Sequence, residues 1–140
     1  MSPDVERRVV YASPTRSARS LDLAAGLIDT RELVRSAAAE AALPPGRVAE
    51  AVLATHEVAM NALTHGRGRG AVRIWTAGDE LVCEIEDHGS GLPDPLAGSE
   101  PPDTHQDRGR GLWITRQVCD RVEIETGPNG TVVRLHWRLS

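Results

Sequence analysis

The chain has 140 residues, a net charge of −4 and 40% hydrophobic residues, which fits one globular domain with its own core. No apolar run reaches the roughly 18 residues of a membrane span, and residues 1–12 lack the apolar stretch of a signal peptide. We therefore expect a cytoplasmic protein without a membrane partner. The absence of a basic face also argues against a nucleic-acid partner.

Two features of the composition narrow the chemistry further. All sixteen basic residues are arginine, which excludes a P-loop, a eukaryote-like protein kinase and Schiff-base chemistry, because each needs a lysine. The only two cysteines, Cys83 and Cys119, lie in apolar periodic segments, so we expect buried free thiols rather than a disulfide framework. Nucleotide chemistry in this chain must therefore use another architecture.

The first third of the chain contains one predicted strand and one predicted helix. Residues 1–17 show little pattern and are expected to form a flexible arm. Weak alternation over 18–24 predicts a short strand. Asp29 followed by Glu32 resembles a capping box that opens a helix, and the Pro-Pro-Gly at 44–46 is expected to end it.

The longest periodic run covers residues 47–65 and predicts a second helix. One face carries Val48, Val52, Thr55, Ala59 and Ala62, and nearly the opposite face carries Glu50, Ala54, Glu57, Asn61 and His65. Three glycines between 66 and 70 end this helix. We therefore expect a buried apolar face and an open polar face.

Two strands follow, joined by a Gly78-Asp79 hairpin turn. The second strand runs directly into the segment 87–91, Asp-His-Gly-Ser-Gly. Residues 92–108 are rich in Pro, Asp and Gly without any period, which is typical of a functional lid, although an insertion without a role has the same composition.

The last third predicts a helix and a second hairpin. A helix over 112–120 is expected to begin just after Gly109-Arg110-Gly111. Strands over 121–126 and 131–139 flank a Gly-Pro-Asn-Gly turn. Grouped helices and adjacent hairpins predict one domain over 18–140 with an α/β (α+β) two-layer sandwich, in which helices cover one face of a mostly antiparallel sheet.

Glu57 and Asn61 lie four residues apart, so their side chains point to the same side of the predicted helix. The carbonyl oxygen of Asn61 suits Mg²⁺, which takes one or two protein oxygens and completes its shell with phosphates and water. Glu57 would orient or deprotonate a hydroxyl or a water near the γ-phosphate of ATP. The pair by itself is equally typical of a solvated helix face.

Asp87 ends an apolar strand, where a partly desolvated carboxylate needs a donor such as the 6-amino group of adenine. Gly89 and Gly91 would let the backbone turn sharply and approach a flat base. A loop aspartate in a glycine-rich turn is the simpler alternative. Thr131 opens the last strand, and its hydroxyl would hold Asp87 or a bridging water, unless it is only a β-branched strand residue.

A second glycine pair lies at a predicted helix start. Backbone N–H groups of Gly109, Gly111 and Leu112 would attract phosphate there. Arg108 and Arg110 would add charge-assisted hydrogen bonds. A helix that merely begins after glycine, with two solvated arginines, gives the same pattern.

Taken in order, these segments resemble the ATPase superfamily shared by gyrase, histidine kinases and MutL. Residues 57–62 resemble its N box, 87–91 its first glycine box and 109–112 its second. The extended pattern is most similar to the bacterial anti-sigma-factor serine kinases. It comprises Thr55-His56-Glu57, Asn61-Ala62, His65-Gly66 and Arg108 to Trp113. The resemblance covers roughly residues 18–139.

The resemblance implies a Bergerat-type ATP-binding fold. It implies that Asn61 ligates Mg²⁺, that Asp87 accepts from adenine and that Glu57 is the general base. The pocket would be shaped by Gly89, Gly91, Gly109 and Gly111, with Thr131 near the base. The implied partners are an anti-anti-sigma protein that is phosphorylated on serine, a sigma factor that is sequestered, and a second copy of the chain in a homodimer.

Three alternatives stay open at this point. The first is a module that binds nucleotide and sigma factor without transferring phosphate, but a pure binder would not need Glu57. A histidine-kinase-like catalytic domain acting in trans is the next alternative, and it is disfavoured because no helical hairpin with an acceptor histidine precedes the domain. Simple ATP hydrolysis without a protein substrate is the third alternative. It is disfavoured because the sequence shows none of the additional domains that use hydrolysis in gyrase-like relatives.

Overall fold

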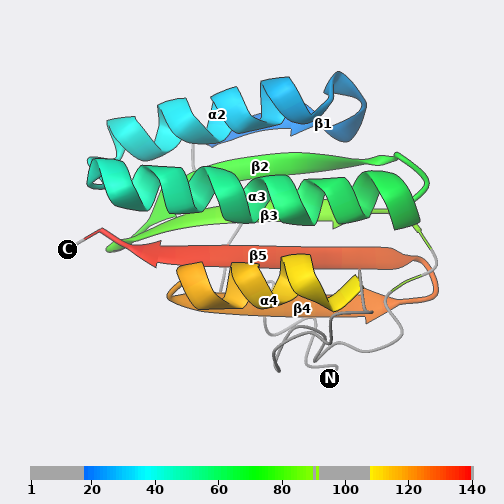
Figure 1. Ribbon diagram of the computed structural model, residues 1–140. Coiled ribbons are helices and arrows are strands. Elements are labelled where there is room, and N and C mark those ends of the chain that lie inside the picture. The colour runs from blue at the N-terminus through cyan, green and yellow to red at the C-terminus, as the bar shows by residue number, and fades with distance from the viewer. Residues whose placement is uncertain (1–17, 90, 92–107, 140) are drawn as a thin grey trace.

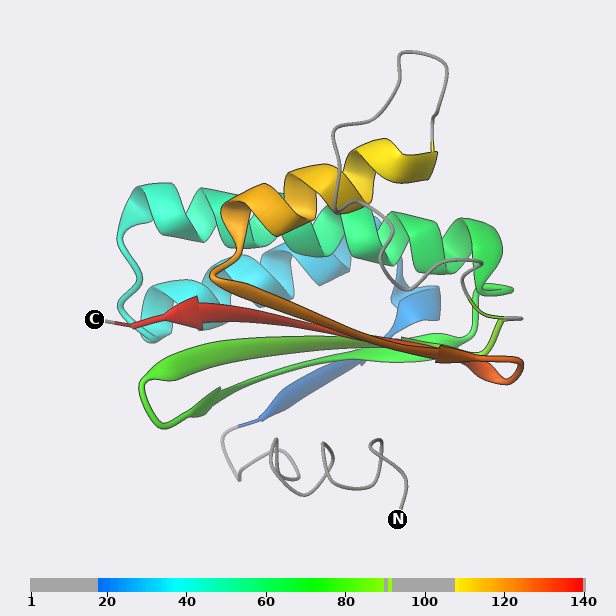
Figure 2. The same ribbon diagram turned by 90° about the horizontal axis from the view of Figure 1, so that it is seen from below.

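The computed structural model describes residues 18–89, 91 and 108–139. Their elements are β1 (Arg19–Asp22), a 3₁₀ turn η1 (Leu23–Ala25), α2 (Leu27–Glu40), α3 (Pro45–His65), β2 (Gly70–Ala77), β3 (Glu80–Asp87), α4 (Arg108–Val118), β4 (Arg121–Gly127) and β5 (Gly130–Arg138). The strands form one antiparallel sheet in the order β1-β2-β3-β5-β4. The helices lie on one face of this sheet (Figures 1 and 2), so the predicted two-layer α+β architecture is confirmed.

The core lies between the sheet and the helices, because every second strand residue points toward the helices. On β5 these residues are Val133, Leu135 and Trp137, which are buried as the alternation predicts. Cys83 of β3 is buried beside them, and burial raises the pKa of its thiol to about 12. Cys119 is half-buried, and both cysteines are free.

Helix α3 is buried on two sides rather than one. Val52, Thr55, Ala59 and Ala62 face the core as predicted. Ala54 was expected on an open polar face but is also buried, because α4 packs against that side of α3 (Figure 2). Alanine is small enough to let the second helix approach closely.

The boundaries of α2 differ from the prediction. The helix begins at Leu27 after Gly26, and no side chain caps its N-terminus. The expected capping box is therefore wrong: Asp29 is already inside the first turn, and Glu32 pairs with Arg35. The helix ends at Glu40, ahead of the Pro-Pro-Gly segment, and Pro45 instead opens α3 at a position where its missing N–H is harmless.

Helix α4 also begins earlier than predicted. It starts at Arg108 and ends at Val118, so the second glycine pair lies inside its first turn rather than ahead of it. The expected arm (1–17) and the expected lid (92–108), apart from Arg108 at the start of α4, lie outside the described residues. Among the helices that the structure describes, none is long and apolar enough to cross a membrane.

The sheet face turned away from the helices carries charged side chains. Arg134 of β5 bonds Glu84 of β3 and Glu125 of β4 through two contacts of 2.9 Å. Arg73 of β2 bonds Glu84 as well, at 2.8 Å. These cross-strand pairs connect the neighbouring strands β2, β3, β5 and β4 of the sheet. Positive and negative side chains alternate from one strand to the next.

Candidate functional site

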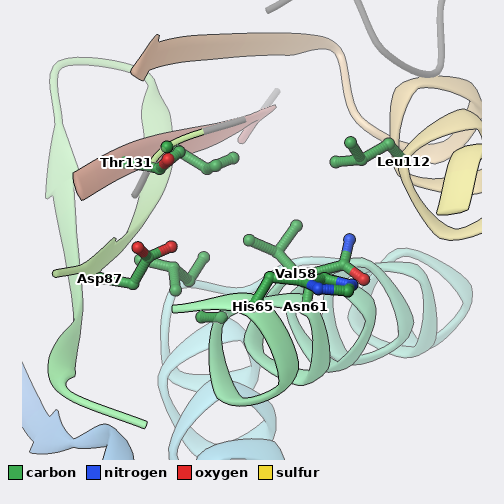
Figure 3. Close-up of a pocket in the computed structure, with 10 residues that line it drawn as sticks. Val58, Asn61, His65, Asp87, Leu112 and Thr131 are labelled. Atoms are coloured by element: carbon green, nitrogen blue, oxygen red, sulfur yellow. The ribbon is translucent and has the colours of Figure 1, made fainter. Parts of the chain in front are cut away.

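A cavity lies where α3, α4 and the ends of β3 and β5 meet (Figure 3). Its lining residues are Val58, Asn61, Ala62, His65, Ile85, Asp87, Gly91, Leu112, Thr131 and Val133. Asp87 and Thr131 extend into it from neighbouring strands, Asn61 from α3 and Leu112 from α4. The structure thus brings together residues that are up to 70 positions apart in the chain and that the sequence singled out separately.

Asp87 is held in one orientation by its own loop. Its Oδ1 accepts a hydrogen bond of 2.9 Å from the backbone N–H of Gly89. Its Oδ2 has no hydrogen-bond partner among the described residues. One carboxylate oxygen is therefore fixed by the backbone, and the other remains available to a ligand N–H.

Two glycines bring the end of α3 into contact with this loop. A Cβ on Gly66 would lie 2.6 Å from Cβ and Cγ of Asp87 and 2.4 Å from the carbonyl oxygen of Ala62. A Cβ on Gly89 would lie 2.6 Å from Cα of Gly66. A side chain at Gly66 would therefore displace Asp87, and one at Gly89 would push its loop away from the end of α3. Gly66 was noted only as a helix end and as part of the resemblance, and its packing against Asp87 was not foreseen.

Thr131 lies beside Asp87 because the two residues are direct partners in the β3–β5 ladder. It is buried, and its Oγ1 lies 2.9 Å from Oγ1 of Thr126 on β4. The expected location of Thr131 near Asp87 is thus what the structure shows. Thr126 was missed, because a strand's lateral neighbour cannot be read from one alternating pattern.

Glu57 and Asn61 point to the same side of α3 but reach different parts of the site. Asn61 lines the cavity, with His65 one turn further along. Glu57 lies against the first turn of α4, where a Cβ on Gly111 would be 2.7 Å from its Oε2. The absence of a side chain at Gly111 gives the Glu57 carboxylate its place at the start of α4.

The remaining predicted residues are divided between the cavity wall and the helix start. Gly91 adopts φ +93°, and a Cβ there would meet the carbonyl oxygen of Gly127 at 2.3 Å, so this position requires glycine. Leu112 is buried against the cavity. Arg108, Gly109 and Arg110 form the first turn of α4.

The donor set of the cavity fits the groups that the sequence implied. Asn61 offers an amide oxygen of the kind that Mg²⁺ accepts. Aliphatic side chains of α3, β3, β5 and α4 surround Asp87 and Thr131, which is the mixture of apolar walls and few polar groups typical of a base-binding pocket. The cavity volume is about 30 Å³, which is roughly the volume of one water.

The sequence profile of the histidine kinase-like ATPase domain matches residues 22–137. The chain belongs to this family. The superfamily expected from the three boxes is thereby confirmed. No curated protein matches the chain by sequence comparison.

Solved structures with the fold of a histidine kinase-like ATPase domain resemble the chain. The RsbU and RsbW domains of Rv1364c from Mycobacterium tuberculosis match with a TM-score of 0.65 and 22% identity, over 90% of this chain and 33% of that one. The chain thus spans about a third of the length of that structure.

Two further matches come from histidine kinases. A histidine kinase domain of Erythrobacter litoralis EL346 gives a TM-score of 0.56 and 20% identity, over 95% of this chain and 73% of that one. The mycobacterial sensor histidine kinase MprB gives a TM-score of 0.56 and 17% identity, over 86% of this chain and 97% of that one. At these identities the likeness establishes the ATPase fold.

Proposed function

We propose that the chain is a Mg-ATP-dependent serine kinase that acts as an anti-sigma regulatory factor. It phosphorylates an anti-anti-sigma partner and sequesters a sigma factor. The observation that carries the proposal is the placement of Glu57 at the first turn of α4, one helical turn from Asn61 in the cavity. The RsbW domain in the best-superposing of the structures described above supports the anti-sigma branch.

In this proposal each side chain has one task in nucleotide binding. Asp87 Oδ2 accepts from the adenine amine, and Thr131 lies beside the base. The first turn of α4, with Arg108 to Leu112, faces the phosphates with its N–H groups. Asn61 would hold Mg²⁺, which supplies charge neutralisation on the phosphate oxygens.

Glu57 has the task of a general base. Phosphoryl transfer depends mainly on position and electrostatics, so the protein has to align the acceptor hydroxyl and remove its proton. The Glu57 carboxylate lies at the start of α4, whose N–H groups would face the phosphates. This position supports Glu57 as the acceptor of the proton from a serine hydroxyl that attacks the γ-phosphorus.

Nucleotide binding is tested by titration calorimetry of ATP with Mg²⁺. We expect Asn61→Ala to abolish measurable Mg-ATP binding, because no other amide oxygen among the described lining residues replaces it. Thr64→Ala is the matched control, since Thr64 is exposed on the same helix and should leave binding unchanged. Equal affinity of wild type and Asn61→Ala would refute the assigned metal ligand.

Phosphate transfer is tested with labelled ATP and candidate serine-bearing antagonist proteins from the same genome. We expect Glu57→Gln to bind ATP like wild type and to lose about 10²- to 10⁴-fold in transfer rate, the usual contribution of a general base. Glu32→Gln, on the exposed face of α2, is the control. Full transfer by Glu57→Gln would disprove the base assignment.

The same assay separates the alternatives. Wild type that binds ATP but labels no protein would favour the non-catalytic sigma-binding module. Label that is stable to base but labile to acid would indicate phosphohistidine and thus a histidine-kinase-like activity in trans. The presence of Glu57 at the start of α4 favours the serine kinase over the pure binder.

A further inference from the structure

Thr126 completes a row of polar side chains across the sheet beside the cavity. Asp87 of β3 is the ladder partner of Thr131 on β5, and Thr131 is the partner of Thr126 on β4. Partners in an antiparallel ladder point to the same face. The three side chains therefore stand in line on the helix-covered face, and two of them, Asp87 and Thr131, line the cavity (Figure 3).

The two hydroxyl groups of this row are hydrogen-bonded. Oγ1 of Thr126 and Oγ1 of Thr131 are 2.9 Å apart, and Thr131 is buried. A hydroxyl has one proton and two lone pairs. If Thr126 donates in this bond, Thr131 accepts with a lone pair and keeps its own proton for the cavity.

We propose that Thr126 donates its hydroxyl proton to Thr131 and is thereby a positioning residue that sets the specificity of the site for adenine over 6-oxopurines. This inference rests on the proposed nucleotide function. Adenine presents an amine donor at C6 next to an acceptor at N1. Asp87 can only accept, whereas Thr131, when it accepts from Thr126, donates toward N1 directly or through one water. Hypoxanthine and guanine present the reverse order, an acceptor at C6 and a donor at N1.

A packing role for Thr126 has to be separated from this one. A Cβ on Gly91 would lie 3.0 Å from Thr126 Oγ1, so Thr126 also touches the loop that follows β3. Thr126→Val keeps the shape of the side chain and removes the hydroxyl. Thr126→Ser keeps the hydroxyl and removes the methyl group. The two variants therefore distinguish the hydrogen bond from the packing.

The test is calorimetric titration with three nucleoside diphosphates. ADP has both the amine and the N1 acceptor, purine riboside diphosphate has only the acceptor, and inosine diphosphate has neither. We expect Thr126→Val to weaken ADP and purine riboside diphosphate by the same factor, about fivefold, as for one neutral hydrogen bond. Binding of inosine diphosphate should stay unchanged or improve, and Thr126→Ser should behave like wild type.

Three outcomes would overturn the inference. Thr126→Val that binds all three diphosphates as wild type does would show that its hydroxyl has no role. Equal weakening of all three would assign Thr126 to packing, as would a loss in Thr126→Ser that matches the loss in Thr126→Val. Wild type that binds none of the three would instead overturn the proposed nucleotide function, which this inference presupposes.

Discussion

Gly66 ends α3 at the point where the helix backbone touches Asp87. We expect Gly66→Ala to lower ATP affinity about ten- to hundredfold. The added Cβ would push the carboxylate away from the cavity, and a hydrogen bond to a charged group is worth about 1.5–3 kcal/mol. Calorimetric titration with ATP measures the change.

Gly46→Ala is the matched control for this substitution. Nothing lies within 4 Å of a Cβ at Gly46, which is in the first turn of α3 far from the cavity. It should leave ATP affinity unchanged and, if anything, stabilise the helix. Unchanged affinity of Gly66→Ala, with a thermal midpoint near that of wild type, would contradict the assigned role of this contact.

The residues at the cavity could be predicted to different degrees. Asp87, Asn61, Thr131 and Leu112 were singled out from the sequence, and all four line the cavity. Their chemical roles stay predictions. The role proposed for Thr126 could not be predicted, because it depends on the pairing of β4 with β5, and the register of two strands is not visible in either strand alone.

Arg134 joins three strands on the sheet face away from the helices. Its side chain is 5% exposed, and its partners Glu125 and Glu84 are 8% and 14% exposed. Burial by itself lowers the pKa of the Arg134 guanidinium, but Glu125 and Glu84 outweigh burial and raise that pKa above its usual value. The charge of Arg134 is therefore held in place by two carboxylates that have little access to water.

We expect Arg134→Met to lower the free energy of unfolding by about 3–5 kcal/mol, because it leaves the nearly buried Glu125 carboxylate without the guanidinium that pairs with it and takes away one of the two arginines that bond Glu84. Urea unfolding measures the change. Arg35→Met is the control, since Arg35 is exposed on α2 and pairs with Glu32 across one helical turn. Its loss should stay within about 0.5 kcal/mol. A loss of similar size in both variants would refute the argument.

Helix interiors were easier to predict than helix ends. The periodic pattern of α3 identified its core face, but Ala54 on the other side is covered by α4, which a single helical pattern does not reveal. Likewise, the glycines at 109 and 111 look like a break in the sequence and yet lie inside α4. At Gly111 a Cβ would meet the Glu57 carboxylate at 2.7 Å, so a side chain there would shift Glu57 from its present position.

The stability of the whole chain is expected to depend on pH through His136. This buried residue lies 2.9 Å from Glu123 and 3.5 Å from Glu80, and Arg121 is close to it. Burial and then Arg121 lower the pKa of His136 below its ordinary 6.5, against the smaller opposing effect of the two carboxylates. The unfolded chain therefore binds a proton at this histidine more readily than the folded chain.

Protonation of the unfolded state destabilises the fold as the pH falls below about 6.5. We expect the contribution of His136 to the free energy of unfolding to be constant above that pH and to decrease from pH 6.5 to 5.5. His136→Gln should lose this decrease, whereas His56→Gln, at a half-exposed position on α3, should keep it. Parallel pH profiles for wild type and His136→Gln in urea unfolding would count against the assignment.

The sequence predicted the overall architecture more reliably than it predicted the ends of the individual helices. Alternation in four long strands and two turn signals predicted the hairpins β2–β3 and β4–β5. The order of strands in the sheet was not predicted, and only the expectation that the Thr131 hydroxyl holds Asp87 implied that β3 and β5 are neighbours. Nothing local in either strand specifies that pairing.

The small size of the cavity has a consequence for affinity. Ligand pockets commonly enclose about 300–1,000 Å³, whereas this one has a volume of about 30 Å³, and Leu112 of α4 closes one side of it. Among the described elements, α3 is packed on two sides, so we expect a purine to enter the cavity with a displacement of α4. The measured dissociation constant would then be the intrinsic one divided by the fraction of molecules with α4 displaced. Leu112 would thus change the occupancy of the site through that fraction, and not through a contact of its own with the ligand.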